Sequence, residues 1–101
     1  MKLQQLIGDC KPQQVVGNVD RDVTGIEIDS RLIKEGAVFV AMRGTQVDGH
    51  SFIGKAIELG AAVVVCERLP ESLSDDVTYL AYPNTDDVVG TLATHFFGDP
   101  S

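Results

Sequence analysis

Apolar residues recur along the chain with two different periods, and each period predicts one kind of element. Spacings of three and four residues predict helices, because residues at these distances share one helix face. This spacing predicts a short helix at 2–7, a second at 50–59 and a last one that begins after Asn84 or Thr85, each followed by a glycine. The apolar stripe expected on the last helix consists of Val88, Val89, Leu92, Ala93, Phe96 and Phe97.

Shorter apolar segments predict the strands of a sheet. Two continuous runs, 37–42 and 61–66, contain β-branched residues and are typical of strands buried on both faces. Ile26 and Ile28 alternate with acidic residues, which is the period of a half-buried strand. Two further candidate strands are Val15–Val16 and Val77–Ala81. Strand, helix and strand in this order predict an α/β fold, a small single domain built from βαβ-type units.

The composition fits one folded domain with an acidic surface. Of 101 residues, 44% are hydrophobic, and 8 basic against 15 acidic residues give a formal net charge of -7. This balance argues against nucleic-acid and anionic-membrane partners, because both need a basic surface. No apolar run approaches the ~20 residues that cross a bilayer. The first 12 residues lack the apolar segment of a secretory signal, so we expect a cytoplasmic location.

The first candidate binding loop is Asp29-Ser30-Arg31, directly after the predicted strand at Ile26 and Ile28. Open α/β sheets place ligand contacts at the ends of strands. Ser30 offers a hydroxyl that donates and accepts, and Arg31 offers a cation with five donors. The alternative interpretation is structural, with Asp29 or Ser30 capping the next turn and Arg31 in an ion pair.

The second candidate loop runs from Gly44 to His50, between a buried run and a predicted helix. Its backbone N–H groups and the helix N-terminus could hold an anion. Thr45 and Gln46 add hydrogen-bonding side chains suited to the edge of a heterocycle. The alternative is a tight strand-to-helix connection in which Asp48 caps the helix.

The sequence contains no complete active site. The glycines of the second loop have the spacing of a phosphate-binding GxxxxGK[ST] motif, but His50 stands where that motif has lysine. The two cysteines, Cys10 and Cys66, are expected as reduced thiols, and with two distant histidines they predict no metal site. For His95 we expect an exposed or capping role.

Residues 28–67 resemble the N-terminal domain of the bacterial Mur ligases of the MurE and MurF type. The shared elements are Asp29-Ser30-Arg31, Gly36, Phe39-Val40-Ala41, Gly44 through Asp48-Gly49-His50, Phe52-Ile53 and Gly60-Ala61. The closing Phe97-Gly98-Asp99-Pro100-Ser101 also resembles the family. The resemblance implies a Mur ligase N-terminal domain over 1–98, with 99–101 as the start of a linker to an ATP-binding domain.

The stretches GTQVDGHSFI and AIELGAAVVVCERLP look more like MurE than MurF. That type adds the third peptide residue to the peptidoglycan precursor UDP-N-acetylmuramoyl-L-alanyl-D-glutamate. The resemblance implies that this domain binds the UDP part of that substrate and holds no catalytic residue. The UDP contacts that it implies are Ile28, Ser30, Thr45, Gln46 and Val47.

The resemblance also implies what lies outside this stretch. The parent enzyme would be an amide-forming ligase that uses ATP and magnesium, bound by later domains. The 101 residues would then bind no cofactor, would be inactive alone, and would work with those domains and with the UDP-N-acetylmuramoyl-dipeptide substrate. The alternatives are the N-terminal domain of MurF, or a stand-alone nucleotide-sugar-binding module. The sequence leaves open whether the added amino acid is diaminopimelate or lysine.

Overall fold

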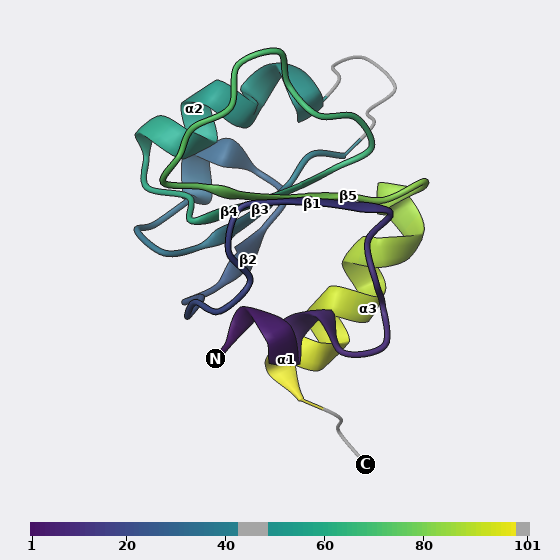
Figure 1. The fold of residues 1–101 in the computed structure, drawn as a ribbon. Helices are drawn as coiled ribbons and strands as arrows, with labels where there is room; N and C mark the ends of the chain where they lie inside the picture. The colour runs from purple at the N-terminus through teal and green to yellow at the C-terminus, as the bar shows by residue number, and fades with distance from the viewer. Residues whose placement is uncertain (43–48, 99–101) are drawn as a thin grey trace.

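One five-stranded sheet forms the centre of the computed structural model, which describes residues 1–42 and 49–98 (Figure 1). Its strands are β1 (Gln14–Val16), β2 (Ile26–Glu27), β3 (Val38–Val40), β4 (Val63–Cys66) and β5 (Thr78–Ala81). They are arranged in the order β1-β5-β4-β3-β2, with β1 antiparallel to β5 and every other pair parallel. The four parallel strands therefore end at one common carboxyl edge.

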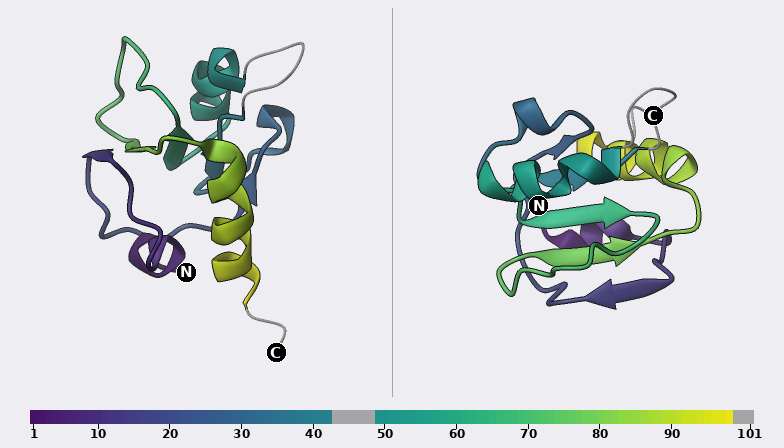
Figure 2. Two further views of the ribbon diagram at one scale, coloured as in Figure 1. Left: turned by 90° about the vertical axis from the view of Figure 1, so that its right-hand side faces the viewer. Right: turned by 90° about the horizontal axis from the view of Figure 1, so that it is seen from above.

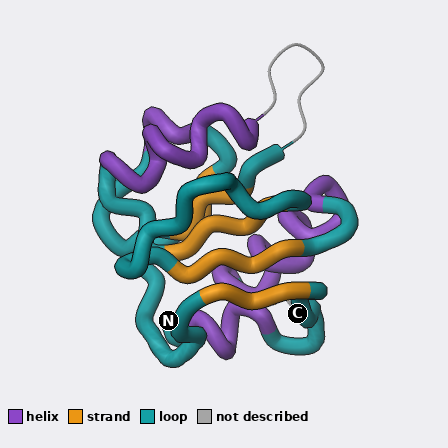
Figure 3. The backbone as a smooth tube through the Cα atoms, turned by 45° about the horizontal axis from the view of Figure 1, so that its top comes forward, coloured by secondary structure: helices purple, strands orange, loops and turns teal. Residues whose placement is uncertain are grey.

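Helices cover both faces of this sheet (Figures 1 and 2). The α-helices are α1 (Leu3–Ile7), α2 (Ile53–Glu58) and α3 (Thr85–Phe97), and the 3-10 turns are η1 (Ser30–Leu32) and η2 (Gly49–Phe52). The helices α1 and α3 lie on one face, while α2 and η1 lie on the other. Figure 3 shows the same layers, with the strands between two groups of helices.

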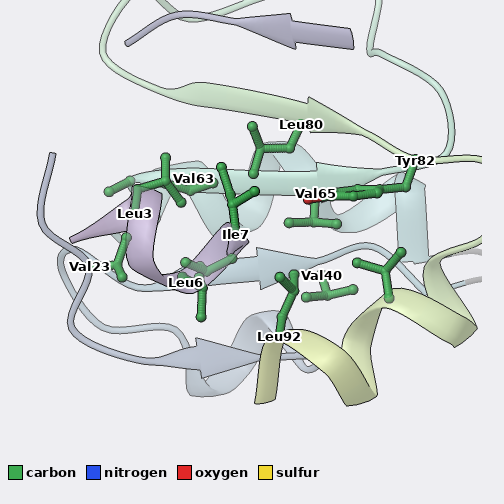
Figure 4. Close-up of a cluster of buried hydrophobic side chains, with 13 residues drawn as sticks. Leu3, Leu6, Ile7, Val23, Val40, Val63, Val65, Leu80, Tyr82 and Leu92 are labelled. Atoms are coloured by element: carbon green, nitrogen blue, oxygen red, sulfur yellow. The ribbon is translucent and has the colours of Figure 1, made fainter. Parts of the chain in front are cut away.

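Side chains of the central strands alternate between two buried clusters, one on each face. Val38 and Val40 join the cluster beneath α1 and α3, whereas Phe39 belongs to the cluster beneath α2. This alternation follows from the two-residue period of a strand. Figure 4 shows the first cluster, whose labelled members are Leu3, Leu6, Ile7, Val23, Val40, Val63, Val65, Leu80, Tyr82 and Leu92.

The central strands confirm the predicted fold class. Every residue of β3 and β4 is buried, as the continuous apolar runs predicted, and every residue of β5 is buried as well. The helix α2 connects β3 to β4, and these strands are parallel neighbours, which makes a βαβ unit. The predicted helix at 50–59 begins as the 3-10 turn η2 and becomes α-helical at Ile53.

Ile28 departs from the predicted alternation. The strand β2 ends at Glu27, and the side chain of Ile28 is 57% exposed. The chain leaves the sheet here because the carboxylate of Asp29 accepts a hydrogen bond from the backbone N–H of Arg31, which starts η1. Ile28 therefore stands at the edge of the sheet instead of continuing the strand.

Phe97 was wrongly predicted to share the buried stripe of the last helix. Val88 and Leu92 are buried in the core and Phe96 packs against it, but Phe97 is 74% exposed. Nine residues at about 100° each place Phe97 on the side of α3 opposite Val88. Its ring meets Phe96 edge to face, with 5.0 Å between the ring centroids.

His95 has the capping role that was one of its two predicted possibilities. In the tautomer with a proton on Nδ1, the ring donates to the carbonyl of Leu6, with 2.7 Å between the two atoms. This bond satisfies a carbonyl in the last turn of α1 and joins α1 to α3. The ring also explains Gly8, where an added Cβ would lie 2.8 Å from His95 Cε1 and the backbone φ is +53°.

Candidate functional site at the carboxyl edge

The carboxyl edge of the sheet brings the first candidate loop beside the end of β3, which the second candidate loop follows in the sequence. The strands β2 and β3 are parallel neighbours, with Ile26 opposite Val38 and Glu27 opposite Phe39. The chain therefore leaves β2 at Ile28 and leaves β3 at Ala41, and these two exits are adjacent on the edge of the sheet. Thr45, Gln46 and Val47, the predicted contacts of the second loop, lie outside the described residues, as does the predicted linker 99–101.

In the first loop, Asp29 and Arg31 form the structural arrangement named above as the alternative. The Oδ1 atom of Asp29 accepts from the backbone N–H of Arg31 at 2.9 Å, and its Oδ2 atom accepts from Nη2 of Arg31 at 2.8 Å. The hydrogen bonds from the Arg31 side chain, and then the one from its backbone, lower the pKa of Asp29 to about 2. Asp29 likewise raises the pKa of Arg31. The positive charge of Arg31 is thus balanced within the loop.

Ile28, just before this loop, and Ser30 within it offer different chemistry. The side chain of Ile28 is an exposed apolar surface, while Ser30 is 6% exposed at the start of η1. An apolar side chain can lie against the face of a base, and a hydroxyl can both donate and accept. Such a pair suits a heterocycle or a sugar better than it suits a bare anion.

Two residues that sequence reasoning missed connect the ends of three strands. Glu67 follows β4, and its Oε2 atom accepts from the backbone N–H of Thr85 at 3.1 Å. The hydroxyl of Thr85 lies 3.2 Å from the same Oε2 atom and 3.2 Å from the carbonyl oxygen of Ala41, which follows β3. In the sequence, only the position of Glu67 pointed to such a role, because it is a charged residue directly after a buried apolar run.

The N-terminus of α3 is already occupied by protein groups. Asn84 is its N-cap, with Oδ1 accepting from the backbone N–H groups of Asp86 at 2.9 Å and Asp87 at 3.4 Å. Glu67 takes the N–H of Thr85, and the N–H of Val88 donates to the carbonyl of Asn84. With two acidic side chains in its first turn, this helix end does not suit an anion.

A hollow of about 370 Å³ lies at the opposite, amino edge of the sheet. Arg21 lines it, but its Nη1 atom donates to the carbonyl of Asp76 at 3.0 Å and contacts the hydroxyl of Thr78 at 3.3 Å. Among the described residues, no buried side-chain nitrogen or oxygen lacks a partner. Arg21 therefore holds the segment that leads into β5 and is not free to bind a ligand in this hollow.

The described residues contain no cluster of metal-ligating side chains. Within 1–42 and 49–98, no three His, Cys, Asp or Glu side chains gather closely enough to hold a metal.

Cys10 and Cys66 are free thiols, and burial raises the pKa of Cys66 to about 11. None of the described helices is long and apolar enough to cross a membrane.

Sequence comparison identifies the family. The profile described as "Mur ligase family, catalytic domain" matches residues 22–97, so the chain belongs to the Mur ligase family. It is 52% identical, over all 101 residues, to the UDP-N-acetylmuramoyl-L-alanyl-D-glutamate--2,6-diaminopimelate ligase of Phocaeicola vulgatus, and covers 21% of that protein. The chain spans about one fifth of the length of the curated relatives it matches.

Solved structures of the family share the fold. MurF from Acinetobacter baumannii superimposes with a TM-score of 0.74 over 93% of this chain and 20% of its own, at 23% identity. MurF ligase from Thermotoga maritima, solved in complex with ADP, gives a TM-score of 0.63 at 31% identity, over 76% of this chain and 17% of its own. The predicted family is confirmed, and relatives 52% and 45% identical to the whole chain carry the MurE-type name.

Proposed function

We propose that this chain is the UDP-binding part of a MurE-type ligase that acts on UDP-N-acetylmuramoyl-L-alanyl-D-glutamate. The observation that carries the proposal is the 52% identity, over the whole chain, to a ligase whose name states that substrate. The same name makes 2,6-diaminopimelate the amino acid that the whole enzyme would add. ATP, magnesium and the amide-forming chemistry belong to the rest of that enzyme, which would act in peptidoglycan synthesis in the cytoplasm.

The carboxyl edge supports this role. Ile28 and Ser30 stand beside the place where the chain leaves β3, and the second loop follows β3 in the sequence. In the proposed arrangement Ile28 packs on the nucleotide and the hydroxyl of Ser30 bonds to it. Thr45, Gln46 and Val47 supply the contacts of the second loop. Holding the substrate at one end reduces the entropic cost of bringing its carboxylate to the reacting groups.

The test is an NMR titration of the chain with UDP, CDP and pyrophosphate. Amide shifts should cluster at 28–31 and at 44–50, and should be strongest for UDP. Ser30→Ala should weaken UDP binding by about 0.5–1.5 kcal/mol, the value of a neutral hydrogen bond, or by ~1.5–3 kcal/mol if its partner is a charged phosphate. The matched control is Ser72→Ala, which removes an exposed hydroxyl from the loop between β4 and β5.

Gln46→Ala separates base contacts from phosphate contacts. If Gln46 faces the base, this variant should bind UDP more weakly and pyrophosphate unchanged. An equal response of the wild-type chain to UDP and CDP, or shifts confined to other regions, would show that these loops do not form a uracil site.

A further inference from the structure

We propose that Glu67 and Thr85 are positioning residues for nucleotide binding, because together they fix the carboxyl end of β3. This inference rests on the proposed function, since it concerns the same edge of the sheet. Neither residue is proposed to touch the nucleotide. Their effect passes through Ala41, which directly follows β3 and precedes the second loop in the sequence.

The hydrogen bonds that carry this inference cross the sheet. Backbone pairing between β3 and β4 ends as the N–H of Ala41 donates to the carbonyl of Val65 at 2.8 Å. Beyond that point, the carbonyl of Ala41 is held by the hydroxyl of Thr85, a residue 44 positions later. Thr85 begins α3, which follows β5, so its side chain reaches across the end of β4 to reach β3.

Glu67 fixes the orientation of Thr85. A hydroxyl carries one proton, and two acceptors lie 3.2 Å from this one: the Ala41 carbonyl and Oε2 of Glu67. The backbone N–H of Thr85 already donates to Oε2 at 3.1 Å. A carboxylate oxygen accepts more than one hydrogen bond, so the hydroxyl lies between Oε2 of Glu67 and the carbonyl of Ala41 and contacts both. Glu67 therefore acts as the acceptor that holds the first residue of α3 in place.

Burial makes this arrangement rigid. Thr85 has no exposed surface, and water cannot replace its hydroxyl as the donor to Ala41. A buried carbonyl that loses its donor must find another, and here it can do so only if the end of β3 moves. Sites built on such fixed elements hold their ligand contacts more precisely than sites on free loops.

The test compares Thr85→Val with Thr85→Ser in the whole 101-residue chain. The valine variant keeps the shape but removes the hydroxyl, whereas the serine variant keeps the hydroxyl. We expect Thr85→Val to weaken UDP binding by roughly 3- to 30-fold and to shift the amides of Ala41, Met42 and 49–52. Thr85→Ser should bind UDP as the wild type does.

A stability control separates positioning from general loss of structure. Tyr79→Phe removes another buried hydroxyl, which accepts from the backbone N–H of Ser74 at 2.9 Å near the amino edge. It should leave UDP binding and the amides of Ala41 and Met42 unchanged. If Thr85→Val does not fold, Glu67→Ala replaces it, since Glu67 is only half-buried.

Equal UDP affinity for wild type and Thr85→Val, or an equal loss in Tyr79→Phe, would overturn the inference. If the wild-type chain does not bind UDP, the proposed function is wrong. The inference about Glu67 and Thr85 then fails with it, whereas UDP binding by the wild type together with equal binding by Thr85→Val rejects the inference alone.

Discussion

Three valine-to-alanine changes test whether both faces of the sheet are covered. Val40 has no exposed surface and packs under α1 and α3, and Val64 has none and packs under α2. Val15 on the edge strand β1 is 44% exposed and serves as the matched control. The same two methyl groups are thus removed from one face, from the other face and from the surface.

The expected costs follow from these exposures. Removing two buried methyl groups loses about 0.8 kcal/mol each in transfer free energy, or roughly 1.6 kcal/mol. The cavity left in a packed core adds to this loss, so we expect about 2–3 kcal/mol for Val40→Ala and for Val64→Ala. Val15→Ala should change the free energy of unfolding by at most about 0.5 kcal/mol.

Urea unfolding followed by far-UV circular dichroism measures these differences. For an m-value of about 2 kcal/mol/M, the midpoint should fall by about 1–1.5 M in both core variants, with m unchanged. A loss in Val64→Ala as small as that in Val15→Ala would refute the three-layer arrangement, because α2 would then not bury its face. A random-coil spectrum of the wild type would show that the chain does not fold alone.

Three further outcomes are expected. A carbon-detected NMR titration should give Asp29 a pKa of about 2 instead of 3.8, and Arg31→Gln should raise that pKa again. Because the pKa is lower in the folded state, the pair of Asp29 and Arg31 contributes stability above pH 3.8, and this stability is lost as the pH falls toward 2. A thiol reagent at mildly alkaline pH should modify Cys10 well before Cys66, whose pKa burial raises to about 11, and two equally fast phases would contradict the buried position of Cys66. With MgATP and the ligase substrates, the chain should release no phosphate above a blank without protein, and any release would contradict the assignment of catalysis to the rest of the enzyme.

The sequence predicted the middle of the sheet well for a physical reason. Strands covered on both faces need apolar residues at every position, so the runs 37–42 and 61–66 marked β3 and β4 without reference to partners. Strand order carries no such local signal. The pairing of β1 with β5, for example, joins Val15 to Leu80 across 65 positions, and nothing in either segment alone specifies it.

In the candidate site, too, local contacts could be predicted from the sequence and long-range contacts could not. The contacts between Asp29 and Arg31 span two residues, so the sequence could suggest both the cap and the ion pair that the structure contains. The bonds of Thr85 to Glu67 and Ala41 span 18 and 44 positions, and exist only because three strands end at one edge. Long-range polar contacts of this kind become visible only once the topology is known.

The charge of the first loop decides what that loop can contribute. Arg31 stood out in the sequence as a cation with five donors, but its guanidinium is bound to Asp29, two residues away. A pyrophosphate would have to compete with the carboxylate of Asp29, which is charged at neutral pH and accepts from Nη2 of Arg31 at 2.8 Å. The N-terminus of α3 is closed to anions by Asn84 and Glu67. The described edge is therefore better suited to an uncharged base and ribose than to phosphates, and under the proposed function we expect the phosphates to contact groups outside the described residues.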